Sequence, residues 1–173
     1  MIIIFIFGGI TLKMNTELEE IIESELKLEQ DQGYYIHKVV DDNDKLISCH
    51  THGLLKNFGH IDLEVTLNIM PIDIAEKILN HICREYIIPG KIRFINNKSF
   101  MLTSLSFGNF RRFTVKLTKD EFGCYVYKLI FYNNDKNNHW GNDIDPIYKG
   151  QWTEEDEYIN DKILNKYYCL ESL

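Results

Sequence analysis

Three histidines and an aspartate lie close together between residues 50 and 62, and these side chains have the types and spacing for chemistry. His50 and His52 are two residues apart, as are His60 and Asp62. Residues two apart on a strand point to the same face, so each pair can present both side chains to one side. Three imidazoles and a carboxylate suit Zn²⁺ or Fe²⁺. One hypothesis is therefore a metal-dependent hydrolase, and no other cofactor is predicted.

The same residues have simpler interpretations. A His60–Asp62 dyad could serve acid–base chemistry, because a carboxylate orients an imidazole and raises its pKa. Alternatively, Gly59 permits a positive φ and His60 bonds the backbone of its loop, which is the role we favour for this segment. Cys49 precedes His50 directly. Neighbouring residues on a strand face opposite sides, so a Cys–His nucleophilic pair is not expected. No catalytic residue is assigned.

Strands are expected to position these side chains. Residues 34–40 and 46–52 read as the two arms of a hairpin, joined by the turn-forming run Asp-Asp-Asn-Asp. After a loop over 53–59, residues 61–67 alternate apolar and polar side chains, as a half-buried strand does. Pro71 suits the start of a helix whose apolar stripe runs to Tyr86, and Pro89-Gly90 ends it.

Two further helices and several strands complete the prediction. Residues 16–30 read as an amphipathic helix, with an apolar stripe facing the core and glutamates facing water; the stripe comprises Leu18, Ile21, Ile22 and Leu26. Strands are expected at 92–95, 100–107, 110–117 and 124–132, and a last helix at 154–168. The fold class is α+β, a single domain with a largely antiparallel sheet and helices packed on one side.

The ends of the chain and its composition set the class. Residues 1–14 form an apolar leader, either untranslated because synthesis begins at Met14 or outside the fold, and residues 15–173 form the domain. The leader is too short for a membrane span, so no membrane contact is expected unless residues 1–13 are a real anchor. A net charge of −7 argues against nucleic acid. Four widely spaced cysteines indicate reduced thiols in the cytoplasm, although two disulfides are possible.

Two other stretches have the composition of binding surfaces. Arg111 and Arg112 lie between two phenylalanines, which suits a phosphate or an acidic partner, although charges on an edge strand also block sheet-to-sheet pairing. Trp140 lies in a loop rich in asparagine and glycine, either as a recognition tip or as a cap on the core. The predicted binding surface combines the 50–62 segment with this loop: His52, Gly53, His60, Asp62 and Trp140.

Several motifs together resemble a known family. Gly33-Tyr34 precedes a strand, and Thr51-x-Gly53-Leu54 and Gly59-His60-x-Asp62-Leu63 come before a helix. This order is similar to the bacterial domain of unknown function family 4262, over about residues 20–145. The family pattern has tyrosine where this chain has His50, isoleucine at His52, proline at Ile61 and glutamate at Asp62. Residues 131–133 also replace its tryptophan-proline-aspartate stretch, and Trp140 alone remains of its later motif.

The resemblance implies a shared fold more than a shared activity, because the family has no established reaction. The leading hypothesis is therefore a cytoplasmic binding or interaction module with a protein partner, such as an immunity or regulatory protein of bacteria. The alternative is the metal-dependent hydrolase, with a His/Asp site formed by His50, His52, His60 and Asp62.

Overall fold

The computed structural model describes residues 16–41, 43, 46–67, 69–103, 107, 110–119, 123–132 and 151. Its helices are α1 (Thr16–Gln32), α2 (Leu54–Phe58) and α3 (Ile72–Ile82), which continues into the π-helical turn η1 (Cys83–Ile87). Its strands are β1 (Tyr35–Val40), β2 (Leu46–His52), β3 (Asp62–Val65), β4 (Ser99–Met101), β5 (Arg112–Lys119) and β6 (Tyr125–Phe131). The predicted last helix and the leader lie outside the described residues.

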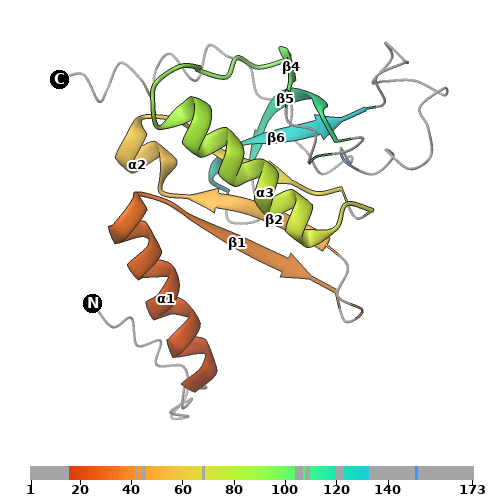
Figure 1. Ribbon diagram of the computed structural model, residues 1–173. Helices are drawn as coiled ribbons and strands as arrows, with labels where there is room; N and C mark the ends of the chain where they lie inside the picture. Colours follow the sequence, from red (N-terminus) through yellow and green to blue (C-terminus); the bar gives the residue numbers. More distant parts are fainter. Residues whose placement is uncertain are drawn as a thin grey trace.

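The six strands form one sheet in the order β1-β2-β3-β6-β5-β4. All neighbours are antiparallel except β3 and β6, which run parallel. Helix α3 lies across one face of this sheet, and α1 extends away from it beside β1 (Figure 1). The predicted α+β class with a mostly antiparallel sheet is confirmed. None of the helices among the described residues is long and apolar enough to cross a membrane.

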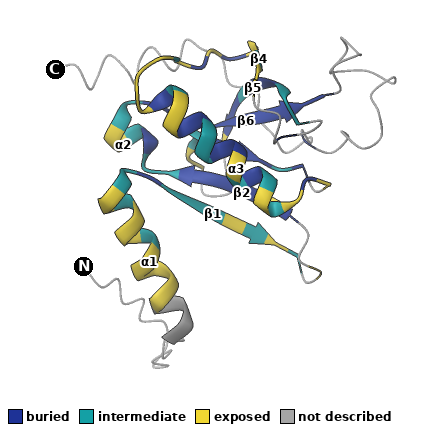
Figure 2. Ribbon diagram, viewed as in Figure 1, coloured by how far each residue is buried: buried dark blue, intermediate teal, exposed yellow. Residues whose placement is uncertain are grey.

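The hydrophobic core lies between the sheet and α3. The buried face of α3 carries Ala75, Ile78, Leu79 and Ile82, at the helical spacing that the sequence predicts. From the sheet, side chains such as Cys49, Leu63, Val115 and Leu129 pack into the same cluster. Burial is deepest in β2, β3, β5 and β6, whereas α1 is largely exposed (Figure 2).

Some predicted elements differ from the structure. Residues 92–95 form no strand, and of the described residues between 100 and 107 only Phe100 and Met101 belong to a strand, β4. Phe94 and Phe107 are nevertheless buried and belong to the core, so their apolar character serves packing without regular strand pairing. The 53–59 segment, expected to be a loop, contains α2, which begins after Gly53 and ends at Gly59.

Candidate functional site

Three imidazole rings gather on the sheet face opposite α3, where β1 and β2 pair. His50 and His52 share this face, as their spacing predicts, and their ring centroids lie 4.7 Å apart. His37 joins them because it is the cross-strand partner of His50, with ring centroids 5.3 Å apart. Tyr35 stacks on His52 at 4.9 Å. We call His37, His50 and His52 the histidine cluster.

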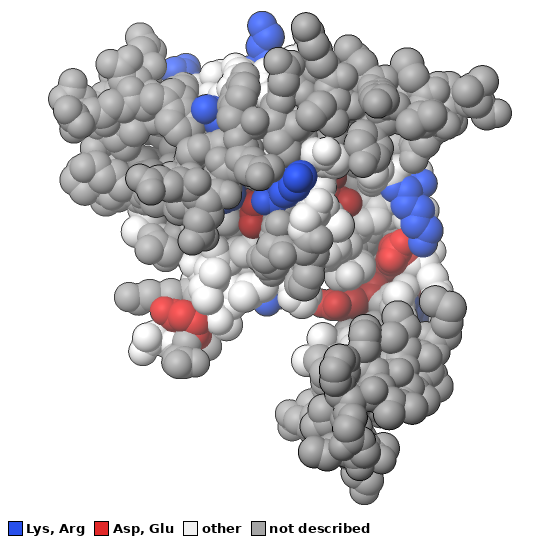
Figure 3. All heavy atoms as spheres, turned by 180° about the vertical axis from the view of Figure 1, so that it is seen from behind, with Lys and Arg blue, Asp and Glu red and all other residues white. Residues whose placement is uncertain are grey.

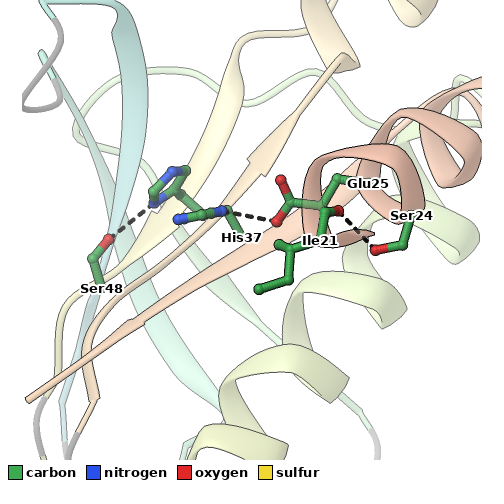
Figure 4. A network of polar contacts seen from close by, with 6 residues as sticks. Ile21, Ser24, Glu25, His37 and Ser48 are labelled. Carbon is green, nitrogen blue, oxygen red and sulfur yellow. Dashed lines mark hydrogen bonds and ion pairs between the residues drawn. The ribbon is translucent and has the colours of Figure 1, made fainter. Parts of the chain in front are cut away.

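Carboxylates and a hydroxyl hold the cluster from both sides. Glu25 of α1 lies 2.9 Å from Nδ1 of His37, and Ser48 lies 3.1 Å from Nδ1 of His50 (Figure 4). The Ser48 hydroxyl donates its proton to Glu64 over 3.0 Å. A hydroxyl has one proton, so His50 must be the donor in its bond with Ser48. A nucleophilic serine needs the opposite arrangement, in which the imidazole accepts the serine proton. The network therefore orders the sheet face and does not activate Ser48, which is itself buried.

The cluster is one end of a row of ionisable side chains that crosses five strands. Cross-strand register places His37 beside His50, His50 beside Glu64, Glu64 beside Lys128, and Lys128 beside Lys116. Acidic and basic side chains both show on this face (Figure 3). Burial lowers the pKa of Lys116. Glu64 is buried between an imidazole and an ammonium, which offsets part of the cost of removing its charge from water.

Asp62 is used to hold the α2 turn. Its carboxylate accepts a hydrogen bond from the Thr51 hydroxyl at 2.8 Å and from the backbone N–H of Leu54 at 3.1 Å. The Thr51 hydroxyl oxygen in turn accepts a hydrogen bond from the backbone N–H of Leu63 at 2.8 Å. Through this bond and its bond to Asp62, one hydroxyl links β2, β3 and the start of α2. Gly53 turns the chain into the helix with φ 97°, a left-handed conformation that favours glycine. Burial raises the pKa of Asp62 to about 6, although these hydrogen bonds lower it.

His60 lies in the core on the α3 side, away from the histidine cluster. Its Nδ1 donates to the carbonyl of Ile61 at 2.7 Å, and its Nε2 accepts the backbone N–H of Phe94 at 3.3 Å. Its ring also packs against Phe94 and Tyr127. Burial lowers the pKa of His60 to about 4, so the neutral ring is the form that the fold holds. The favoured structural role is confirmed, since Gly59 has φ 60° and both ring nitrogens of His60 bond the backbone.

The four predicted metal ligands are thus not brought together. His50 and His52 lie side by side, but His60 and Asp62 have separate partners and do not share a strand face, because β3 begins only at Asp62. Within the described ranges, no group of three or more His, Cys, Asp or Glu side chains is arranged to hold a metal ion. The expected separation of Cys49 from His50 is confirmed, since Cys49 lies in the core, where burial raises its pKa to about 12.

The remaining predicted binding residues divide between the core and undescribed segments. Phe110 and Phe113 pack edge-on or tilted against Phe131 and so are not available for stacking on a ligand. Arg112 lies 5.9 Å from the ring centre of Tyr132. Trp140 lies outside the described residues. Cys49 and Cys83 are buried free thiols, Cys124 is exposed, and Cys169 is likewise outside the described part.

Comparison with known proteins gave no match. No family model matches the chain, no curated protein matches it, and no solved structure matches it. The resemblance to family 4262 therefore stays a prediction. Function has to be argued from the geometry of this chain.

Helix α1 departs most from the sequence prediction. Its apolar stripe was expected to face the core, but three of its members, Ile21, Ile22 and Leu26, are exposed by two-fifths or more, and so is Leu28. We call these four side chains the α1 aliphatic surface. Among the side chains described from residue 20 to 32, none belongs to the hydrophobic core. Glu25, expected to face water, instead contacts His37 (Figure 4).

Polar contacts attach α1 to the rest of the molecule. Besides the Glu25–His37 contact, Glu29 accepts from Lys56 of α2 at 2.7 Å, and Gln32 accepts from Arg84 at 3.3 Å. Exposed ion pairs contribute little to stability, about 0–1 kcal/mol each. The helix is therefore positioned without its apolar side chains being buried. The sequence did not predict the histidine cluster, because His37 becomes part of it only through its contacts with Glu25 of α1 and His50 of β2.

Proposed function

We propose that this protein is an interaction module that binds a protein partner through the α1 aliphatic surface. The observation that carries the proposal is that a helix of 17 residues keeps Ile21, Ile22, Leu26 and Leu28 exposed. Isolated helices of this length are marginal in water and are normally stabilised by burying that stripe. A partner that covers it would supply the missing burial. Scattered exposed aliphatics are ordinary, but here four fall within eight residues of one helix, in two pairs on either side of its attached Glu25–Glu29 line.

The hydrolase alternative has less support from the side chains that it requires. Asp62 and His60 each use their polar atoms to fix backbone, and the Ser48 proton points to Glu64. Cys49 is buried with a raised pKa and so is a poor nucleophile at neutral pH. A binding role needs none of these groups to be reactive. We further propose, from the resemblance to family 4262, a cytoplasmic role of the immunity or regulatory kind.

The test is co-purification with a matched pair of variants. The double variant Ile22→Gln/Leu26→Gln replaces two of the four side chains of the α1 aliphatic surface, which are 40% and 50% exposed. Ile88→Gln/Ile95→Gln is the control, at 39% and 53% exposure elsewhere on the molecule. The tagged full chain and both variants are expressed in the native host, and bound proteins are identified by mass spectrometry. A partner retained by the wild type and the control but lost from the α1 variant supports the proposal. Identical partner lists for all three proteins would reject it.

A further inference from the structure

The charge of α1 identifies the chemistry of a matching partner. The helix contains seven acidic residues and one lysine, a net charge of −6 in a chain whose total is −7. Glu25 and Glu29 are engaged with His37 and Lys56. Glu20, Glu23 and Asp31 are exposed, and only Lys27 opposes them on the same segment.

The aliphatic and acidic side chains are arranged in stripes along the helix. An α-helix has 3.6 residues per turn, so Ile22 and Leu26 fall on one side of the Glu25–Glu29 line and Ile21 and Leu28 on the other. Glu23 lies next to Leu26 on the outer side, so the Ile22–Leu26 pair has acidic side chains on both of its borders. An apolar arc bordered by one sign of charge is complementary to an amphipathic segment bordered by the other sign.

We propose that the Ile22–Leu26 side of the α1 aliphatic surface binds an amphipathic helical segment of a partner protein, with an apolar face bordered by lysine and arginine. The inference rests on the proposed function and names the partner's chemistry. Helix-to-helix docking of this kind reads apolar anchors at positions i, i+3, i+4 and i+7, and Ile22 and Leu26 supply one such pair, at i and i+4. A second copy of this chain is disfavoured, because it would bring two helices of charge −6 together. An anionic membrane surface would repel the same helix.

The probe is a synthetic amphipathic peptide of leucine and lysine with a fluorescent label, and its matched control has glutamate in place of every lysine. Binding to the full chain is followed by fluorescence anisotropy at low and high salt. The lysine peptide is expected to bind at least tenfold more tightly than the glutamate peptide, and less tightly as salt rises. Ile22→Gln/Leu26→Gln should weaken binding at least tenfold, whereas Ile88→Gln/Ile95→Gln should leave it unchanged.

A charge-reversal pair separates a specific surface from general attraction. Glu23→Lys on α1 should weaken binding of the lysine peptide, and Glu85→Lys on η1, which is also exposed, should not. Equal weakening by both would overturn the proposal in favour of non-specific charge attraction. Sedimentation that shows a dimer abolished by the α1 variant would assign the surface to a second copy. Co-sedimentation with phosphatidylcholine vesicles, lost in the same variant, would assign it to a membrane.

The two proposals fail in different ways. If the partner found by co-purification is lost from the α1 variant but the lysine peptide does not bind, the interaction function stands and the partner chemistry is wrong. If no partner depends on α1 and neither peptide binds, both proposals fall.

Discussion

The opposed titrations of His60 and Asp62 give a quantitative test of the fold around the α2 turn. Burial lowers the pKa of His60 from 6.5 to about 4. The stability that depends on its neutral ring is complete above pH 6.5 and is lost as the pH falls through the folded-state pKa. At about 1.36 kcal/mol per pKa unit, the loss on acidification is about 3 kcal/mol.

Asp62 acts in the opposite sense. Burial raises its pKa from 3.8 to about 6. A raised carboxyl pKa contributes stability that is present below pH 3.8 and is lost as the pH rises through 6, which amounts to about 3 kcal/mol. The two effects cover nearly the same pH range and largely cancel in the wild type.

The perturbation that separates them is Asp62→Asn, which keeps an oxygen for the Thr51 and Leu54 donors but cannot ionise. Urea unfolding followed by circular dichroism at several values between pH 7.5 and 3.5 gives the free energy of unfolding of each protein. Relative to the wild type, the Asn variant should lose about 3 kcal/mol of stability between pH 7 and pH 3.5. His60→Gln should move the opposite way by a similar amount.

Asp73 provides the control, because it is an exposed carboxylate whose pKa is lowered by its bond with Lys77. Asp73→Asn should track the wild type closely over the same pH range. If the wild type and Asp62→Asn give parallel curves, the hydrogen bonds from Thr51, Leu54 and Gly53 fully offset the effect of burial on the Asp62 pKa, and the reasoning about Asp62 is refuted. A flat difference for His60→Gln would refute the buried neutral imidazole.

Three further predictions test the local structure. Gly53→Ala should destabilise the protein by more than the roughly 1–2 kcal/mol that a left-handed backbone costs a non-glycine residue, because the new Cβ would lie 2.8 Å from the Gly33 carbonyl oxygen. Gly90 is also left-handed but has open space around it, so Gly90→Ala should cost only that backbone penalty of about 1–2 kcal/mol. Thermal unfolding of both variants measures the difference. Thr51→Val should cost about 1–3 kcal/mol in urea unfolding, because it leaves the Leu63 N–H unpaired. Iodoacetamide at pH 8 should alkylate Cys124 before Cys49, because Cys49 is buried with a pKa of about 12; peptide mapping that finds Cys49 modified first would contradict this.

The histidine cluster shows where sequence reasoning stops. The two arms of the hairpin were predicted almost to the residue, and so was the shared face of His50 and His52. Uninterrupted pairing from Val40 and Leu46 would set His37 opposite Cys49. An irregularity between Val39 and Val40 shifts the register by one residue and sets His37 opposite His50. A shift of one residue exchanges the two faces of a strand, and no pattern in the sequence marks this irregularity.

Short elements were missed for a different reason. Helix α2 has five residues, too few to show helical periodicity, and the signal for it is the pair of glycines at its ends. The segments at 92–95 and 100–107 have strand-like composition because their aromatic side chains fill the core. Phe94, for example, packs against Phe100 and Phe113 although residues 92–95 form no strand. Strand propensity measures how well a side chain fits a half-buried surface, and these aromatic side chains fit such a surface although their backbone is irregular.

Helix α1 reverses the usual relation between pattern and burial. Its existence and extent were predicted from capping and periodicity, yet the fold contacts its Glu25–Glu29 line and leaves the aliphatic side chains on either side exposed. Consistency between local pattern and tertiary burial is the rule in natural sequences, and departures concentrate at functional positions. A solvent-facing helix would be stable enough with polar residues in place of its aliphatics. The proposed bound state, in which a partner covers them, would account for their presence, and the net charge of −6 on the same helix would favour a basic partner.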